Sequence, residues 1–317
     1  MKLPTDFASA LRCPKCMSNL ENNANSFNCS NFNCKTSFPI VNGIPVLINE
    51  ENSVFSINDF IEMSDTTFKT KKNVFKGMLV RFIPSISKNL KAKENYSKYV
   101  KSLLSNCSTP KVLILGGRIK GEGMDVLLEN PSIEFYESDV SFGPRTKFII
   151  DAHNIPFPNE YFDGVIIQAV LEHVVDPYRC VQEIFRVLKK DGFVYAETPF
   201  MQQVHGGKYD FHRFTYLGHR RLFRYFSEID SGIVCGPGMA LAWAYSYFIY
   251  SFTNSKVIRK LLYPIVNLTS FFLKYFDHYL INKPGALDAA SGYFFFGQKS
   301  SIPLTDIELL KLYRGLS

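Results

Sequence analysis

The sequence lacks any long apolar run. No stretch reaches the roughly 18 consecutive apolar residues that a membrane-spanning helix needs, and the N-terminus has no apolar segment typical of a secretory signal. Cysteine is scarce outside one N-terminal cluster, because only Cys107, Cys180 and Cys235 lie elsewhere, so a disulfide framework is excluded. These absences favour a reducing compartment, and we expect a cytoplasmic protein.

The sequence also contains little tryptophan, and one stretch contains almost no acidic residues. A single Trp stands against 29 Phe and 17 Tyr, which indicates either a crowded aromatic core or a surface for apolar partners. Glu94 is the one acid in a stretch whose basic residues are Lys69, Lys71, Lys72, Lys76, Arg81, Lys88, Lys91, Lys93, Lys98 and Lys101. Such a stretch could bind phosphates of nucleic acid or lipid, although a solvated helix face is the more common structure.

Four cysteines near the N-terminus have the spacing of metal ligands. Cys13 and Cys16 form one short-spaced pair, and Cys29 and Cys34 form another after 12 intervening residues. Four thiolates would fill the tetrahedral shell of Zn²⁺ and leave no position for water, so the predicted ion is structural. A segment this short would depend on the metal to fold; the alternative is four cysteines without a ligand.

Two apolar runs follow the cysteines and flank Asn42-Gly43, a dipeptide typical of a hairpin turn. With its cysteine pairs and its Gly-Ile-Pro-Val-Leu segment, the stretch 10–52 resembles the small zinc-ribbon proteins that activate tRNA and other methyltransferases. The resemblance implies that residues 1–52 form a docking or stabilising module. Residues 53–107 are predicted to be a basic linker that ends in a helix.

From Lys111 onward, strands, turns and helices alternate. The strand at 112–115 runs into Gly116 and Gly117, and the strand at 133–139 ends in an acid. A strand that ends in glycines lets backbone N–H groups approach a nucleotide. This alternation predicts an α/β fold with a Rossmann-like, doubly wound parallel sheet over residues 108–300.

Several motifs then follow at regular intervals: Asp151-Ala152 with Pro156-Phe157, Phe162-Asp163, Val170-Leu-Glu-His-Val174, and Arg186-Val-Leu-Lys before Gly192. In this order they resemble class I S-adenosylmethionine-dependent methyltransferases, especially the branch that methylates quinones and small molecules. The resemblance covers about 108–225. It implies the cofactor S-adenosyl-L-methionine, with ribose held by Asp139, adenine held by Asp151 and Ala152, and further contacts from Gly116, Gly117, Gln168 and Ala169.

One motif departs from the family. Ile114 stands where the first strand usually has an acid, and the glycine loop carries Arg118 and Lys120, whose charges would repel a sulfonium. Glu122 or a backbone contact could replace the carboxylate. A low cofactor affinity, a catalytically silent relative and a generic Rossmann protein are the alternatives.

The segment 200–214, after the fifth strand of the core, is dense in groups that can donate, accept or transfer a proton. In-line methyl transfer to an alcohol needs a held nucleophile and a proton acceptor. We predict His205 and His212 as general bases, with Tyr209, Asp210 and Arg213 positioning the acceptor. Each of them could instead be an ordinary hydrogen-bonded residue.

The last part of the core is predicted to contain strands at 227–234 and 292–299, separated by a helical insertion at about 238–286, and 301–317 is predicted as a tail helix. The apolar segment 239–252 is interpreted as a buried helix. A dimer contact or a membrane-surface patch beside Arg259, Lys260 and Lys274 is the alternative.

The leading hypothesis is a methyltransferase that acts on a small molecule or a glycan, on oxygen. An RNA methyltransferase is the first alternative, based on the ribbon and the basic stretch, although the Asn-Pro-Pro-aromatic signature of enzymes that methylate base amines is missing. A non-catalytic scaffold that binds through the ribbon is the second. Peripheral membrane contact stays open, and the sequence predicts no oligomeric state.

Overall fold

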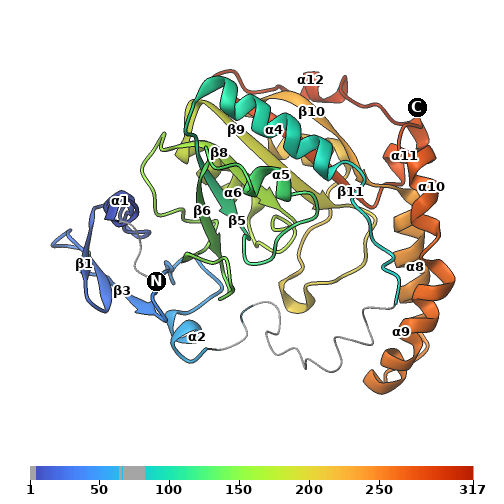
Figure 1. The fold of residues 1–317 in the computed structure, drawn as a ribbon, viewed down its shortest axis with the longest axis horizontal. Coiled ribbons are helices and arrows are strands. Elements are labelled where there is room, and N and C mark those ends of the chain that lie inside the picture. The colour runs from blue at the N-terminus through green and yellow to red at the C-terminus, as the bar shows by residue number, and fades with distance from the viewer. Residues whose placement is uncertain (1–4, 64–65, 67–82, 317) are drawn as a thin grey trace.

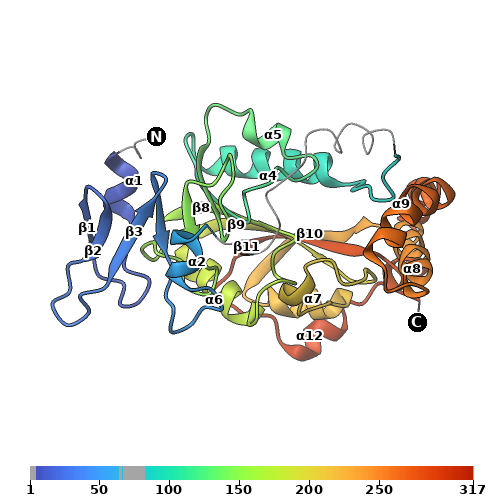
Figure 2. The same ribbon diagram turned by 90° about the horizontal axis from the view of Figure 1, so that it is seen from below.

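The computed structural model describes residues 5–63, 66 and 83–316, and these build one mixed sheet with the strand order β1-β2-β3-β4-β7-β6-β5-β8-β9-β11-β10. Helices cover both faces of its central part (Figures 1 and 2). The strands are β1 Leu20–Asn23, β2 Ser26–Cys29, β3 Ser37–Val41, β4 Ile44–Leu47, β5 Lys111–Leu115, β6 Glu134–Asp139, β7 Phe148–Ile150, β8 Phe162–Gln168, β9 Leu188–Pro199, β10 Phe226–Cys235 and β11 Gly292–Lys299.

The two faces of the sheet carry separate cores. One contains Tyr96, Tyr99 and Leu103 of α4, and the other contains Cys180, Val181 and Ile184 of α6. The helices are α1 Thr5–Ala10, α2 Ile57–Ile61, α4 Ala92–Asn106, α5 Asp125–Leu128, α6 Pro177–Val187, α7 Tyr216–Leu222, α8 Pro237–Ser251, α9 Lys256–Ser270, α10 Leu273–Leu280, α11 Pro284–Asp288 and α12 Asp306–Leu310, with a 3₁₀ turn η1 at Gly207–Tyr209. The predicted doubly wound α/β class is confirmed.

Local sequence explains the best-defined elements. Asp176 caps α6 by accepting the N–H of Arg179, and Pro177 takes the first helical position, where its missing N–H costs nothing. In the β3–β4 hairpin, Asn42 and Gly43 have φ values of 52° and 78°, as a tight two-residue turn requires.

The N-terminal strands continue the central sheet. β4 pairs in parallel with β7, with Val46 opposite Ile149 and Leu47 opposite Ile150. Phe27 and Phe38 of the N-terminal segment belong to the same buried core as the central strands. The predicted N-terminal module is therefore an extension of the main sheet.

The predicted helical insertion is confirmed, because α8 to α11 all lie between β10 and β11. The interpretation of 239–252 as a buried helix is wrong. Leu241, Tyr245 and Phe248 of α8 are exposed, since the helix buries mainly small residues on its inner side. Among the described residues, no helix combines the length and the apolar content needed to cross a bilayer.

The basic stretch is described only in part. Lys69, Lys71, Lys72, Lys76 and Arg81 lie outside the described residues. Of those described, Lys91 and Lys98 pair with Glu94, and Lys98 also pairs with Asp230. Within 301–317, the described residues form helix only at α12.

Candidate functional site

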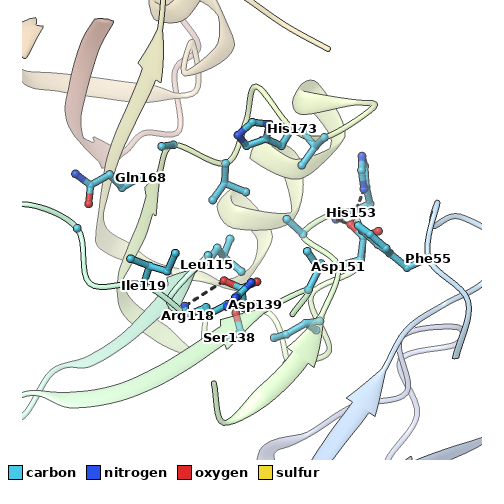
Figure 3. Close-up of a pocket in the computed structure, with 18 of the residues that line it drawn as sticks. Phe55, Leu115, Arg118, Ile119, Ser138, Asp139, Asp151, His153, Gln168 and His173 are labelled. Atoms are coloured by element: carbon cyan, nitrogen blue, oxygen red, sulfur yellow. Dashed lines mark hydrogen bonds and ion pairs between the residues drawn. The ribbon is translucent and has the colours of Figure 1, made fainter. Parts of the chain in front are cut away.

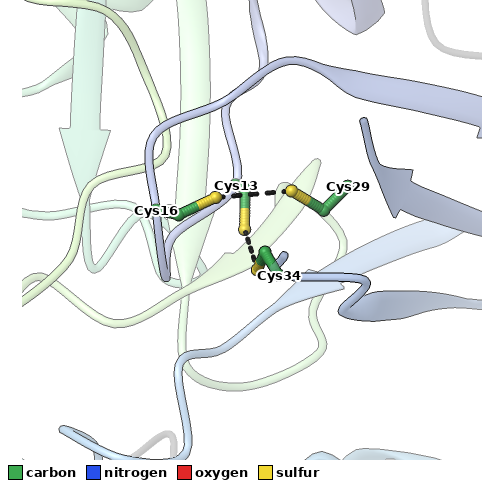
Figure 4. A group of neighbouring side chains, drawn as sticks. All are labelled: Cys13, Cys16, Cys29 and Cys34. Atoms are coloured by element: carbon green, nitrogen blue, oxygen red, sulfur yellow. Dashed lines mark hydrogen bonds between the residues drawn. The ribbon is translucent and has the colours of Figure 1, made fainter. Parts of the chain in front are cut away.

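Among the described residues, the leading candidate sites are a cluster of thiols and a cavity at the carboxyl ends of the central strands. The four predicted metal ligands Cys13, Cys16, Cys29 and Cys34 place their sulfur atoms within 4.8 Å of one another (Figure 4). The Sγ atoms of Cys13 and Cys34 are 3.8 Å apart, and those of Cys16 and Cys29 are 3.4 Å apart. Tetrahedral Zn²⁺ with bonds of about 2.3 Å separates its sulfur ligands by about 3.8 Å, so the cluster fits this ion.

The cysteine cluster is tied to the core of the molecule. The N–H of Arg12 donates to the carbonyl of Pro156 (2.9 Å), and the amide of Asn49 donates to the carbonyl of Pro14 (3.5 Å). Cys13 itself is completely buried. If the cysteine cluster became disordered, the central domain would therefore be destabilised as well.

A cavity of about 370 Å³ opens at the carboxyl ends of β5, β6 and β8 (Figure 3). This is the edge where open parallel sheets bind nucleotides. The predicted cofactor residues that line it are Gly116, Asp139, Asp151, Ala152, Gln168 and Ala169. Gly117, the remaining predicted cofactor residue, does not line the cavity, and its N–H donates to the carbonyl of Ser138 (2.8 Å).

Asp139 ends β6 and points into the cavity (Figure 3), where its Oδ2 accepts the N–H of Arg118 (3.1 Å). Burial raises the pKa of Asp139 to about 6, although the hydrogen bond and charge of Arg118 act in the opposite direction. Lys120, the other cation in the glycine loop, turns to Asp125 (2.5 Å). The loop thus directs one of its two charges away from the cavity.

Asp151 follows β7 and is held by a network that includes the N-terminal segment. Its Oδ1 accepts the N–H of His153 (3.0 Å) and lies 2.6 Å from Nδ1 of the same residue, while Ser53 donates to Oδ2 (2.5 Å). Burial opposes ionisation of Asp151, but His153 and Ser53 outweigh it and lower the pKa. Val54 and Phe55 also line the cavity. Sequence reasoning had assigned these three residues to a linker.

Glu197, at the end of β9, was missed by sequence reasoning. Its carboxylate lines the cavity and accepts hydrogen bonds from Gln168 (2.8 Å), Asn89 (2.9 Å) and Tyr195 (2.5 Å). Burial raises its pKa. Glu122, suggested as a replacement for the missing acid, instead accepts the N–H of Asn89 (2.9 Å) and does not line the cavity.

Two residues that line the cavity, Gly116 and Ala169, have left-handed backbone conformations. Ala169 has a φ of 53°, in the left-handed region that non-glycine residues seldom adopt. Gly116 has a φ of 79°, and a Cβ atom there would lie 2.3 Å from the side chain of Val170. A glycine is therefore required at 116, as the sequence predicts.

Glu172, His173 and His205 meet at the other end of the cavity, which both histidines line. The Nε2 atoms of His205 and His173 lie 3.6 Å and 3.8 Å from Oε1 of Glu172. Glu172 is fully buried, and neither carboxylate oxygen has a hydrogen-bond partner among the described residues. Burial lowers the pKa of His205, but the neighbouring Glu172 outweighs it and raises the pKa overall.

Of the two predicted general bases and the three predicted positioning residues, the structure brings only His205 to this cavity. Asp210 accepts the N–H of His205 (2.7 Å) and pairs with Arg213, which holds its pKa far below the usual range. Tyr209 stacks near Phe55 (5.4 Å between ring centroids). His212 donates its Nε2 proton to the carbonyl of Val175 (3.2 Å). The Asp210 contacts order the segment 200–214 internally, and those of Tyr209 and His212 join it to residues outside it.

A second pocket of about 650 Å³ lies between that segment and α8. Val204, Arg213 and Leu241 are among its lining residues. Trp243, the single tryptophan, packs edge-on against His205 (6.0 Å between ring centroids) and donates to Ser87 (3.1 Å). The helical insertion therefore packs against the end of the cavity that His205 lines.

The chain is similar to known methyltransferases in part of its sequence and in its fold. Residues 130–196 match the sequence profile of a family described as "Methyltransferase domain". Among solved structures, the chain is similar to an O-methyltransferase from a trans-AT PKS multienzyme of Brevibacillus brevis in complex with S-adenosyl-L-homocysteine, with 16% identity, 82% of this chain and 84% of that chain covered, and a TM-score of 0.43. It is also similar to a SAM-dependent methyltransferase from Archaeoglobus fulgidus, with 14% identity and a TM-score of 0.41. The match covers 72% of this chain and 100% of that chain.

No curated protein sequence matches the chain. The domain match nevertheless confirms the enzyme class that the sequence predicts, a methyltransferase that depends on S-adenosylmethionine.

Proposed function

We propose that this enzyme methylates a hydroxyl oxygen of a small molecule or glycan, and that His205 removes the hydroxyl proton. The observation that carries the proposal is the pair formed by His205 and the buried Glu172, whose carboxylate accepts no hydrogen bond from the described residues, at one end of the cofactor cavity. When bound, S-adenosylmethionine supplies an electrophilic methyl group for in-line displacement.

The residues of the cavity fit this cofactor. Asp139 would accept both ribose hydroxyls, and Asp151 with Ala152 would hold the adenine. The cofactor's methionine part would extend past Gly116 and Gly117 toward Gln168 and Ala169. Glu197 takes the part of the missing acid, since its buried carboxylate can accept the ammonium of that group.

Glu172 prepares His205 for proton transfer. As the methyl group is transferred, the acceptor hydroxyl becomes acidic and its proton passes to Nε2 of His205. The positive charge of the resulting imidazolium is then stabilised by the carboxylate of Glu172, 3.6 Å away, whereas the neutral ring gains little from it. Glu172 is therefore a positioning residue that favours the protonated product of this step.

The four-cysteine cluster is proposed to hold a structural zinc ion. All four ligand positions are sulfur, so no site is left for water or substrate. The resemblance to small activator proteins supports a stabilising role for this segment. Four reduced thiols also support a reducing compartment, and we keep the cytoplasm as the proposed location.

Two experiments on the full chain test the function. Calorimetric titration with S-adenosylmethionine should show binding, and no heat change would leave the non-catalytic scaffold as the better explanation. Radiolabelled cofactor should then transfer its methyl group to members of a panel of hydroquinones, phenols and glycosides. Transfer to RNA alone, together with RNA binding that weakens steeply with salt, would favour the RNA methyltransferase.

His205→Gln tests the role of the base. We expect a loss in kcat of roughly 100-fold to 10,000-fold, the usual contribution of general-base catalysis, with unchanged affinity for S-adenosylmethionine. An unchanged kcat would show that the hydroxyl loses its proton to another group.

A further inference from the structure

The helical insertion exposes an unusual amount of apolar surface. The exposed large apolar residues of α8 to α10 and their connections are Leu241, Tyr245, Phe248, Phe252, Val257, Ile258, Leu261, Tyr263, Ile265, Leu268, Phe272, Tyr275, Phe276 and Tyr279. In the figures these helices lie at the end of the molecule opposite the N-terminal strands (Figures 1 and 2). Soluble monomers seldom expose contiguous apolar surface on this scale unless it binds something.

The exposed residues form stripes with helical spacing. On α8 they recur at 241, 245, 248 and 252, which are one face of a helix. α9 repeats the pattern at 257, 261, 265, 268 and 272. Each helix therefore has an outward apolar face, which is the reverse of a helix that packs onto a core.

Apart from Met239 and Val266, the buried residues of α8 and α9 are small or polar. The residues buried there include Ala242, Ser246, Asn267 and Ser270. Asp277 of α10 accepts the N–H groups of Gly238 (2.7 Å) and Met239 (3.0 Å), which ties α10 to the start of α8. Small and polar residues inside, with large apolar residues outside, are typical of helices whose surroundings are lipid.

Charge distinguishes between the candidate partners. Asp277 is the one acid between 237 and 286, and it is buried. Lys256, Arg259 and Lys260 are exposed on the first turns of α9, among the exposed apolar residues. Lys274 does not join them, because it is buried and bonded to the carbonyl of Ser85. Two copies of such a surface would repel each other, whereas an anionic bilayer would attract it.

The lengths of the helices limit the mode of contact. α8 and α9 have 15 residues each and are therefore about 22 Å long, shorter than the roughly 30 Å hydrocarbon layer. We propose that the hairpin of α8 and α9, together with α10, docks the enzyme in the plane of an anionic lipid surface. Leu241 belongs to both the exposed stripe and the second pocket, which the segment 200–214 also lines, so the docked face adjoins that segment.

Flotation of the full chain with lipid vesicles tests this proposal independently of methyl transfer. We expect the protein to float with vesicles of phosphatidylcholine plus phosphatidylglycerol, and much less with phosphatidylcholine alone. The triple variant Lys256→Gln, Arg259→Gln, Lys260→Gln should partition roughly 100-fold more weakly, because each basic residue near an anionic surface contributes about a factor of five.

A second variant, Phe248→Ser with Leu261→Ser, tests the apolar contribution and should also lose flotation. The matched controls are Lys311→Gln and Ile307→Ser, which change an exposed charge and an exposed apolar residue at α12. Thermal unfolding and cofactor binding verify that each variant is folded.

Absence of flotation, or equal flotation with neutral and anionic vesicles, would overturn the proposal. A wild-type dimer in sedimentation that dissociates in the Phe248→Ser, Leu261→Ser variant, without lipid binding, would assign the surface to a second copy of this chain.

Discussion

We expect Asp139, the proposed ribose ligand, to make cofactor binding depend on pH. Its ionised carboxylate can accept two ribose hydroxyls, whereas the protonated form loses part of this capacity. Because burial places its pKa at about 6, we expect the Kd for S-adenosylmethionine to rise as the pH falls through that value. Asp139→Asn should bind roughly 10-fold to 100-fold more weakly, since a hydrogen bond to a charged group contributes about 1.5 to 3 kcal/mol. Calorimetric titration over a pH series measures both effects, and a variant that keeps the pH dependence would assign it elsewhere.

If His205 is the base, as proposed, we expect it to give the methyl-transfer step its own pH dependence. A general base must be neutral, so kcat should fall as the pH drops through the pKa of His205, which Glu172 raises against the opposing effect of burial. Glu172→Gln removes the charge, so the acid limb of the kcat profile should move to lower pH and the maximal kcat should fall. A purely structural role for Glu172 would lower kcat without moving the limb.

At the scale of single residues, the sequence pointed to the acidic residues at the end of a strand or directly after it. Asp139 is the last residue of β6 and Asp151 directly follows β7, and strand ends of a parallel sheet meet at one edge. Ser53 reaches Asp151 from 98 positions away in the chain, and no local pattern signals such a contact. Glu172 belongs to a motif that the sequence shows. That its carboxylate accepts no hydrogen bond from the described residues depends on tertiary packing, which the sequence does not show.

Helix α7 contains a buried histidine that should make folding sensitive to acid. Burial, with the charge of Arg220 added, lowers the pKa of His219 to about 3, and its Nε2 has no partner in the described chain. Its folded pKa lies below the unfolded value of about 6.5, so its contribution is complete above pH 6.5 and is lost as the pH falls toward 3. At pH 5 the loss is about 2 kcal/mol, at roughly 1.4 kcal/mol per pH unit.

His219→Leu isolates this contribution, because the other titrating groups stay the same in both proteins. We expect the free energy of unfolding of the wild type, relative to the variant, to fall by about 2 kcal/mol between pH 7 and pH 5. Denaturant unfolding at the two pH values measures the difference. Parallel curves for the two proteins would show that His219 does not limit acid stability.

At the scale of helices, apolar content alone led to the wrong prediction that 239–252 is a buried helix. Hydrophobicity on all sides normally indicates burial. Here the side chains that pack inward are Ala242 and Ser246, which are small, while Phe248 faces outward. Which face is inward depends on α10, some 30 positions later in the chain, and a local periodicity cannot contain that information.

For the whole molecule, the order of strands in the methyltransferase core was predictable, because alternating strands and helices permit few topologies. The junction with the N-terminal segment was not. A parallel pairing such as that of Val46 with Ile149 joins residues about a hundred positions apart and leaves no local signature. The consequence is that the cysteine cluster and the cofactor cavity belong to one body.

This continuity predicts that metal loss impairs cofactor binding. β4 is followed closely by Ser53, which holds Asp151, and by Phe55, which lines the cavity. Chelation, or Cys13→Ser, should therefore lower the thermal stability and weaken S-adenosylmethionine binding, even though the thiols lie outside the cavity. Metal analysis and calorimetric titration of the same samples test this, with Cys107→Ser as the control outside the cluster. A metal-free protein with unchanged cofactor affinity would show that β4 and the residues after it hold their places without the zinc ion.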